Sequence, residues 1–396
     1  MKNKQPLLTK TLISLLTLTC GVVVANMYYI QPIGTQIAKS FHVTTGSIGL
    51  VTMLTQLGYA FGLLFLVPLG DRMDQRKLII RMTALSSISL LFAFLAPTYS
   101  FFAFSTFLIG LLSIVPQIII PYGAILAGPK NRGKIMGKLL SGLLIGVLFS
   151  RTISGILASI LPWKSIYLVA LVAIAILTIL LKFKMPKTEI QKSSDLSYLD
   201  SLKSIPYLVK SQIILREAAI NGFFMFGTFS IFWSTLIFYI SSPAYHWGSR
   251  EAGILAVLGL SGAASAPIVG RLSDAYTQRN IVLMGLFMQL FSFVLLFFFG
   301  SHLSALLLAI IFLDIGMQFG QVANQTRVQN LGEAASNRNN TVFMFCYFIG
   351  GSFGSLIGTI MWQQAGWVGV TLAGITFQIL AFIFHFVIFG KNQNMS

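Results

Sequence analysis

The sequence predicts an all-α membrane protein with twelve transmembrane helices in two pseudo-symmetric six-helix bundles. The first observation behind this prediction is the composition. Of the residues, 56% are hydrophobic and only 9% are charged, whereas a soluble domain carries about 25% charged residues. The second observation is a series of long apolar stretches, and the third is a charged loop that occurs in both halves of the chain. Lipid must therefore be the main solvent of this chain.

A helix that spans a bilayer needs roughly 20 mostly apolar residues, and about twelve such stretches can be drawn. We expect them at 11–37, 46–69, 78–96, 100–126, 135–161, 164–183, 213–241, 250–270, 280–300, 303–328, 339–363 and 367–389. The apolar run after Lys10 is too long for the core of a cleavable signal peptide, so we interpret it as the first membrane helix.

The basic residues predict the orientation, because cytoplasmic loops carry an excess of Lys and Arg. If the N-terminus is cytoplasmic, the outside loops keep only Lys39, Lys164 and Arg250. We therefore expect both termini in the cytoplasm and the protein in the cytoplasmic (inner) membrane. The formal net charge of +17 does not indicate a nucleic-acid partner, since the basic residues lie between apolar stretches rather than on one face.

The longest polar segment, Pro186 to Ser211, lies midway along the chain. It predicts a cytoplasmic linker between two six-helix domains. The predicted boundaries are 1–185, 186–212 and 213–396. Leucine recurs in this segment at near-helical spacing, which favours an amphipathic helix on the membrane surface; the positions are Leu196, Leu199 and Leu202.

The charged loop Gly70–Lys77 has a counterpart at Gly270–Arg279, and in both copies an Asp precedes an Arg by five positions. A second repeated element opens the fifth and the eleventh helix, at Asn131–Gly133 and Asn337–Asn339. A charged loop at the same place in two halves of an apolar chain indicates a duplicated membrane protein.

At these loops the chain resembles the major facilitator superfamily of secondary transporters, whose signature is Gly-x-Leu-Ala-Asp-Arg-x-Gly-Arg-Arg/Lys. Val67 and Asp74 replace the two glycines of that signature. The matching residues are Leu69, Asp71, Arg72, Arg76 and Lys77 in the first copy, and Gly270, Leu272, Asp274 and Arg279 in the second. The resemblance covers the whole chain and implies the major facilitator fold.

Within the superfamily the chain looks most like the bacterial drug-efflux and sugar-efflux branch. Two departures put drug/proton antiport in doubt. Thr106 stands where the fourth helix of drug antiporters usually carries Arg, four residues before Gly110. The fifth-helix segment Gly142–Arg151 lacks the Pro of the antiporter motif.

The resemblance places Asp71 beside the start of the eleventh helix, where a carboxylate stabilises the helix dipole by about 0.3–2 kcal/mol. The charged loops would then form a cytoplasmic gate that latches the two halves together. The alternative is an ordinary charged turn that follows the inside-positive bias. The predicted gate residues are Asp71, Arg72, Arg76, Lys77, Arg132, Asp274, Arg279 and Arg338.

Ionisable residues inside a membrane helix are costly and are functional candidates. Arg151 in the fifth helix and Asp314 in the tenth both lie about 15 Å below the external surface at 1.5 Å rise per residue, and Asn26 and Gln56 reach the same depth. Secondary transporters hold their substrates at this level. Asp314 and Arg151 either form a buried ion pair or make up a coupling or substrate site, in which a movable pair loads and releases a proton.

The tenth helix carries a polar stripe that lipid would penalise, so the stripe should line a water-filled cavity. Its members are Asp314, Gln318, Gln321 and Gln325. The resemblance implies that the first, fourth, seventh and tenth helices line this cavity, which adds Asn26, Tyr29, Gln117 and Asn221 to the site with Arg151 and Gln56.

The second, fifth, eighth and eleventh helices carry small residues at every fourth position, which allows close helix approach. The repeats begin at Gly58, Gly142, Gly262 and Gly350. The resemblance implies that these helices meet across the two halves, where small residues would ease rocking; static packing is the alternative.

No cofactor and no metal are expected, because the four histidines show no ligand spacing. We place His385 in the last helix, which faces lipid in the family fold. The sequence also contains no phosphate-binding Gly-x-x-x-x-Gly-Lys loop, so ATP drive is not expected.

The predicted function is secondary active transport of a small organic molecule by alternating access, as proton-coupled efflux by a monomer in contact with membrane lipid. Nutrient uptake by symport or facilitated diffusion remains an alternative, because the same fold serves either direction. A flippase for a lipid-linked substrate is a third, and it would require a laterally open amphipathic groove. An enzyme is not expected, since His, Asp and Glu do not cluster near one membrane face.

Overall fold

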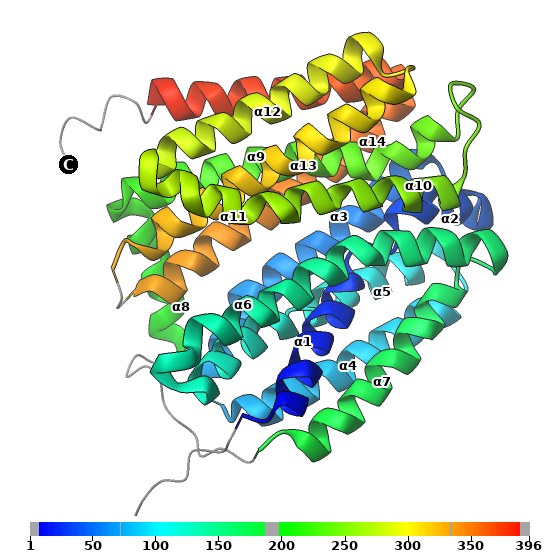
Figure 1. Ribbon diagram of the computed structural model, residues 1–396. Coiled ribbons are helices and arrows are strands. Elements are labelled where there is room, and N and C mark those ends of the chain that lie inside the picture. The colour runs from blue at the N-terminus through cyan, green and yellow to red at the C-terminus, as the bar shows by residue number, and fades with distance from the viewer. Residues whose placement is uncertain (1–7, 72, 187–197, 333–334, 389–396) are drawn as a thin grey trace, which may run out of the picture.

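The computed structural model describes residues 8–71, 73–186, 198–332 and 335–388, and this part of the chain is almost entirely helical (Figure 1). The α-helices are α1 (Lys10–Ala25), α2 (Gly34–Phe41), α3 (Thr45–Phe61), α4 (Gln75–Leu95), α5 (Tyr99–Leu112), α6 (Val115–Ile160), α7 (Ser165–Lys184), α8 (Tyr198–Ser211), α9 (Ile213–Ile240), α10 (Ser249–Leu255), α11 (Leu260–Ala275), α12 (Gln278–Phe299), α13 (Leu303–Gln329) and α14 (Ser336–Ile383). Short 3₁₀ or π segments extend or join them at η1 (Gln31–Ile33), η2 (Gly62–Leu66), η3 (Val67–Asp71), η4 (Ala256–Gly259) and η6 (Phe384–Ile388).

Ten helical segments of the described chain are long and apolar enough to cross a membrane, and the shorter apolar α1 precedes them. The last of the ten, Ser336–Phe386, contains two helices that meet at Gly366, where φ is +58°. Gly128, with φ of +69°, separates the two spans that share α6 in the same way. A glycine adopts this left-handed conformation without steric cost. With the last segment counted as two helices and with α1 added, the described chain contains twelve apolar helical segments, which agrees with the predicted fold class.

The helices that carry the small-residue stripes meet across the two halves, as α3 does with α14 and α6 with α10. The stripes themselves face another helix of the same half. A Cβ atom on Gly58 would lie 2.2 Å from the Phe107 carbonyl oxygen of α5, and one on Gly262 would lie 2.8 Å from the Asp314 carbonyl oxygen of α13. These two pairs, α3 with α5 and α11 with α13, occupy equivalent places in the two halves.

The other two stripes show the same relationship. A Cβ atom on Gly142 would lie 2.4 Å from the Thr17 carbonyl oxygen of α1, and one on Gly350 would lie 2.0 Å from the Phe223 carbonyl oxygen of α9. Helix α6 therefore packs on α1 as α14 packs on α9. Backbones can approach this closely only where no side chain intervenes, so the stripes fix the internal packing of each half.

The two halves touch at the side of the molecule where α2 and α10 lie, which we call the sealed side. The Thr152 hydroxyl of α6 donates to the Gly253 carbonyl of α10 at 2.8 Å, and a Cβ atom on Gly155 would lie 2.2 Å from the Ser249 carbonyl oxygen. Gln36 reinforces this contact by donating to the Ser249 hydroxyl at 3.2 Å.

We call the opposite side, where α8 lies, the linker side. A Cβ atom on Gly133, Gly137 or Gly270 would meet nothing within 4 Å. Figure 1 shows α6 and α11 diverging toward this side. The close contacts of α6 with the second half therefore lie at the sealed side.

Candidate functional site

Arg151 lies between the two halves and is only 1% exposed. Its Nε donates to the Gln31 side-chain oxygen at 2.5 Å. The guanidinium carbon lies 4.8 Å from the ring centre of Tyr28, 5.5 Å from that of Phe229 and 4.4 Å from that of Trp233. These aromatic faces attract the cation, so residues of both halves hold Arg151 in an aromatic cage.

Asp314 on α13 faces Arg151 from the second half and is 6% exposed. Its carboxylate lies beside the Trp233 indole and against Gly259, whose added Cβ would lie 3.0 Å from the Asp314 Oδ1 atom. The ion pairs within 4.0 Å among the described residues do not include Asp314 with Arg151. The two charges therefore attract each other across the site without direct contact.

Both terminal nitrogens of Arg151 have no hydrogen-bond partner within the described chain. Leaving one buried polar group unsatisfied costs about 1–3 kcal/mol, and more for a charged group. A ligand, water or a rearranged side chain would recover this energy. The site is thus built to accept a polar partner.

Gln56 and Gln117 lie near this site but are engaged in other contacts. The Gln56 amide nitrogen donates to the hydroxyls of Ser230 at 3.4 Å and Ser355 at 3.3 Å, both in the second half. Gln117 donates to the Tyr59 hydroxyl at 3.1 Å. Gln56 therefore joins the two halves rather than facing open space.

The polar stripe of α13 continues from Asp314 toward the linker side. Gln321 accepts a bond from the Tyr347 hydroxyl at 3.3 Å, and Gln325 donates to Asn340 at 3.1 Å. Both partners belong to α14. Gln318, which lies between Asp314 and Gln321 on α13, is partly exposed. The stripe thus lies along the interface of α13 with α14, on the side of α13 that also carries Asp314.

Tyr28, not the predicted Tyr29, faces the site. Tyr29 lines a groove between α1 and α6 instead. Regular α-helix ends at Ala25, and residues 26–30 continue as turns, so helical spacing from Asn26 assigns the wrong tyrosine. Asn26 is buried with both side-chain amide atoms unpartnered, and no contact joins it to Arg151.

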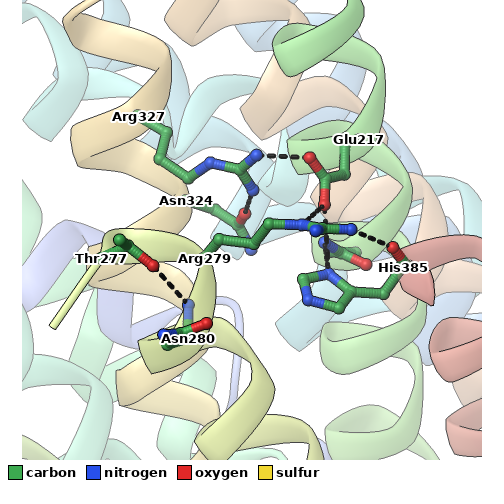
Figure 2. Close-up of polar contacts among 8 residues, drawn as sticks. Glu217, Thr277, Arg279, Asn280, Asn324, Arg327 and His385 are labelled. Carbon is green, nitrogen blue, oxygen red and sulfur yellow. Dashed lines mark hydrogen bonds and ion pairs between the residues drawn. The ribbon is translucent and has the colours of Figure 1, made fainter. Parts of the chain in front are cut away.

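A second polar cluster lies inside the second half (Figure 2). Glu217 of α9, 4% exposed, accepts a bond from Arg279 of α12 at 2.9 Å and one from Arg327 of α13. His385 of η6 lies 3.2 Å from the same carboxylate, and Asn221 lies 3.2 Å from His385. Asn221 therefore belongs to this cluster rather than to the site around Arg151.

Arg279 and Arg76 each bind the last helix of their own half. Arg279 donates to the His385 carbonyl. Arg76 donates to the carbonyls of Lys182 at 2.6 Å and Met185 at 2.9 Å at the end of α7. These contacts are internal to a half, and the role of the two arginines in a latch between the halves stays a prediction.

The remaining predicted gate residues are described only in part. Lys77 lies 4.0 Å from Asp74, and Arg132 is exposed. Arg338 donates to Ser204 of α8 at 2.8 Å. Arg72 and the side chains of Asp71 and Asp274 lie outside the described residues, so the latch at Asp71 stays a prediction.

Sequence reasoning missed Glu217, Arg327 and His385. Glu217 and Arg327 lie near the predicted ends of their helices, where charge is expected. The placement of His385 against lipid was wrong, since this side chain is only 2% exposed. The available signal was chemical: Glu217 is the one carboxylate of α9, and a carboxylate in a membrane helix requires a partner.

The chain matches the sequence model of the protein family named Major Facilitator Superfamily. The match covers residues 16–355, and a second match covers residues 218–394. The chain is 36% identical over 373 residues to the "Putative uncharacterized transporter YgaY" of Escherichia coli (strain K12), covering 94% of each chain.

Two solved structures share the fold. One is a bacterial homolog of the human lysosomal transporter Spinster in an inward-facing and occupied conformation, with a TM-score of 0.75, 13% identity and 96% coverage of each chain. The other is the nucleoside transporter NupG, with a TM-score of 0.76, 14% identity and coverage of 93% of this chain and 98% of that one.

Proposed function

Since the chain belongs to the Major Facilitator Superfamily, we propose that it exports a small organic molecule across the cytoplasmic membrane by proton-coupled alternating access. The positive-inside bias assigns the linker side to the cytoplasm. An opening between α6 and α11 would then admit substrate from the cytoplasm, and rocking of the halves would transfer the opening to the external side.

The observation that carries this proposal is the placement of Arg151 and Asp314, from opposite halves, in one buried site with unpartnered polar atoms. A group held between two halves experiences a different surrounding in each state of the transporter. Substrates of secondary transporters bind at this level of the membrane, so the same residues are placed to sense both substrate and conformation.

We assign the proton to Asp314. A buried carboxylate gains or loses a proton according to the distance of its charged neighbours. If Arg151 approaches Asp314 in one state and withdraws in the other, the carboxylate would release its proton in the first and bind one in the second. Gln318, partly exposed one helical turn closer to the linker side, lies on the route by which water would reach it.

The walls of the site suit a substrate with an apolar face. Phe226 stacks on Tyr347 with ring centres 4.0 Å apart, and Phe229 continues this aromatic surface toward Trp233 at 6.1 Å. Aromatic faces bind planar or cationic groups, while the unpartnered guanidinium nitrogens of Arg151 offer donors to a carbonyl or carboxylate oxygen. The substrate class is therefore a small amphiphile with at least one acceptor group.

The test is transport by the purified full chain in proteoliposomes with an imposed pH gradient and a panel of radiolabelled or fluorescent organic compounds. We expect a compound to move against its gradient when protons flow the opposite way, and Asp314→Asn to abolish this coupling. Asp74→Asn is the matched control, because Asn also caps the start of α4 and the position lies outside the site. Coupled transport by Asp314→Asn would exclude the proton role. Compound and protons moving in the same direction would support uptake by symport instead.

A further inference from the structure

A groove with a volume of about 750 Å³ runs along α1 and the second span of α6. This volume lies within the range of about 300–1,000 Å³ that ligand sites occupy. Apart from Lys10, Lys138 and a few hydroxyl side chains, the wall is apolar or glycine. The lining residues are Lys10, Ile13, Ser14, Thr17, Leu18, Gly21, Val22, Ala25, Tyr29, Lys138, Ser141, Gly142, Ile145, Gly146, Phe149, Ser150 and Ile153.

The groove faces the bilayer, not the space between the two halves. On its α6 wall, Ile145, Phe149 and Ile153 are each about half exposed. Arg151 lies two positions before Ile153, so helical geometry directs it to another face of α6, where it meets residues of both halves. Figure 1 shows α1 between α6 and α7, so the groove opens on the outer surface of the first half.

The groove exists because the two helices meet at glycines. A Cβ atom on Gly146 would lie 2.1 Å from the Gly21 carbonyl oxygen, and one on Gly21 would lie 2.7 Å from the Gly142 carbonyl oxygen. No side chain rises from this seam to fill the space above it. The result is a groove whose base is formed by glycine backbone and whose sides are formed by Leu18 on α1 and Ile145 on α6.

Charge is confined to one end of the groove. Among its described lining residues, Lys10 and Lys138 carry the only charges, and both are exposed. The hydroxyls of Ser14 and Ser141 lie at the same end, on the linker side. At 1.5 Å rise per residue, the distance along α6 from Lys138 to Ile153 is about 22 Å, more than the depth of one leaflet.

We propose that this groove is a binding site for an anionic phospholipid of the leaflet on the linker side. The phosphate lies between Lys10 and Lys138, with the serine hydroxyls as further donors, and one acyl chain lies along the seam past Leu18 and Ile145. Each Lys near the surface attracts an anionic headgroup, and basic pockets between membrane helices on the cytoplasmic side bind such headgroups. A zwitterionic lipid fills the same apolar wall but gains less from the two cations. This site is separate from the one around Arg151 and does not depend on the transport mechanism.

The experiment is native mass spectrometry of the full chain in detergent, titrated with phosphatidylglycerol or with phosphatidylcholine of the same acyl chains. We expect tighter retention of phosphatidylglycerol. The double variant Lys10→Gln/Lys138→Gln should weaken this retention by about fivefold per lysine removed and leave phosphatidylcholine binding unchanged. The matched control is Lys134→Gln/Lys184→Gln, which removes two exposed lysines of α6 and α7 that do not line the groove.

A second pair of variants tests the acyl-chain position. Ile145→Trp places a large side chain over the seam and should reduce phosphatidylglycerol retention severalfold, whereas Ile176→Trp on the exposed face of α7 should not. Equal retention of the two lipids by the unmodified chain would overturn the proposal. The proposal would also be overturned if both double lysine variants lost phosphatidylglycerol retention equally, or if Ile145→Trp retained this lipid as well as the unmodified chain does.

Discussion

Arg76 and Arg279 make equivalent bonds in the two halves: each donates to a backbone carbonyl 106 residues further along the chain, that of Lys182 in the first half and that of His385 in the second. The charged loop thus has a structural role that its repetition alone did not reveal, because it ties the start of the third helix of each half to the end of the sixth. The halves differ in what surrounds this bond. Arg279 also pairs with the buried Glu217, whereas the bonds found for Arg76 are to backbone carbonyls.

This difference predicts that replacing the two arginines by alanine lowers the free energy of unfolding by unequal amounts. Arg279→Ala removes one of the cations that compensate a buried carboxylate, and we expect it to destabilise the protein by about 3 kcal/mol. Arg76→Ala removes hydrogen bonds to neutral carbonyls near the surface and should cost about 1 kcal/mol. Thermal unfolding in detergent, followed by tryptophan fluorescence, would measure both. Equal shifts of the melting temperature in the two variants would contradict the view that Arg279 compensates a buried carboxylate and Arg76 does not.

Glu217→Gln should be among the most destabilising isosteric changes in the chain. It leaves Arg279 and Arg327 partly buried without their carboxylate, and breaking a buried ion pair costs about 3–5 kcal/mol. Glu251→Gln is the control, since Glu251 only caps α10 at the surface. We expect a clear loss of folded protein after mild heating for the first variant and little change for the second. If both variants survive heating equally, the cluster does not stabilise the second half.

Arg151→Lys should abolish transport although it keeps the charge. The planar guanidinium both stacks against Tyr28 and Trp233 and reaches Gln31, and a lysine ammonium cannot do both. Arg81→Lys, at an exposed position of α4 outside the site and the predicted gate, should transport normally. Initial rates in proteoliposomes would compare the two variants at equal protein content. Normal rates for Arg151→Lys would show that the site requires only a positive charge.

Gly155→Leu should force the sealed side apart. The new side chain would collide with the Ser249 backbone of the other half, so the population should shift toward the state that is open at the α10 side. Spin labels at Ile160→Cys and Ile254→Cys, both exposed and on opposite halves, would report a longer distance. The control is Gly137→Leu, which faces open space. An unchanged distance in Gly155→Leu would argue that this contact does not hold the halves together.

Much of the architecture follows from the sequence because lipid imposes a simple rule on helix length and charge. The predicted span 46–69 corresponds to Thr45–Gly70, and the predicted span 303–328 corresponds to Leu303–Gln329. The same rule pointed to Arg151 and Asp314, since two charges inside apolar helices require an explanation.

Side-chain partners were harder to predict because they depend on details that periodicity does not contain. The break after Ala25 rotates the chain and exchanges Tyr29 for Tyr28 at the site. The glycine repeats correctly indicated close packing but not which helix would be the partner. The position of His385 depends on the last helix folding back onto α9, where Glu217 and Asn221 meet it.

The bonds that close the sealed side are all between neutral groups in the described part of the chain. Gln56 donates to Ser230 and Ser355, Gln36 to Ser249, and Thr152 to the Gly253 carbonyl. Dissolved ions screen charges but hardly affect neutral dipoles. The strength of this contact between the halves should therefore change little between dilute buffer and concentrated salt.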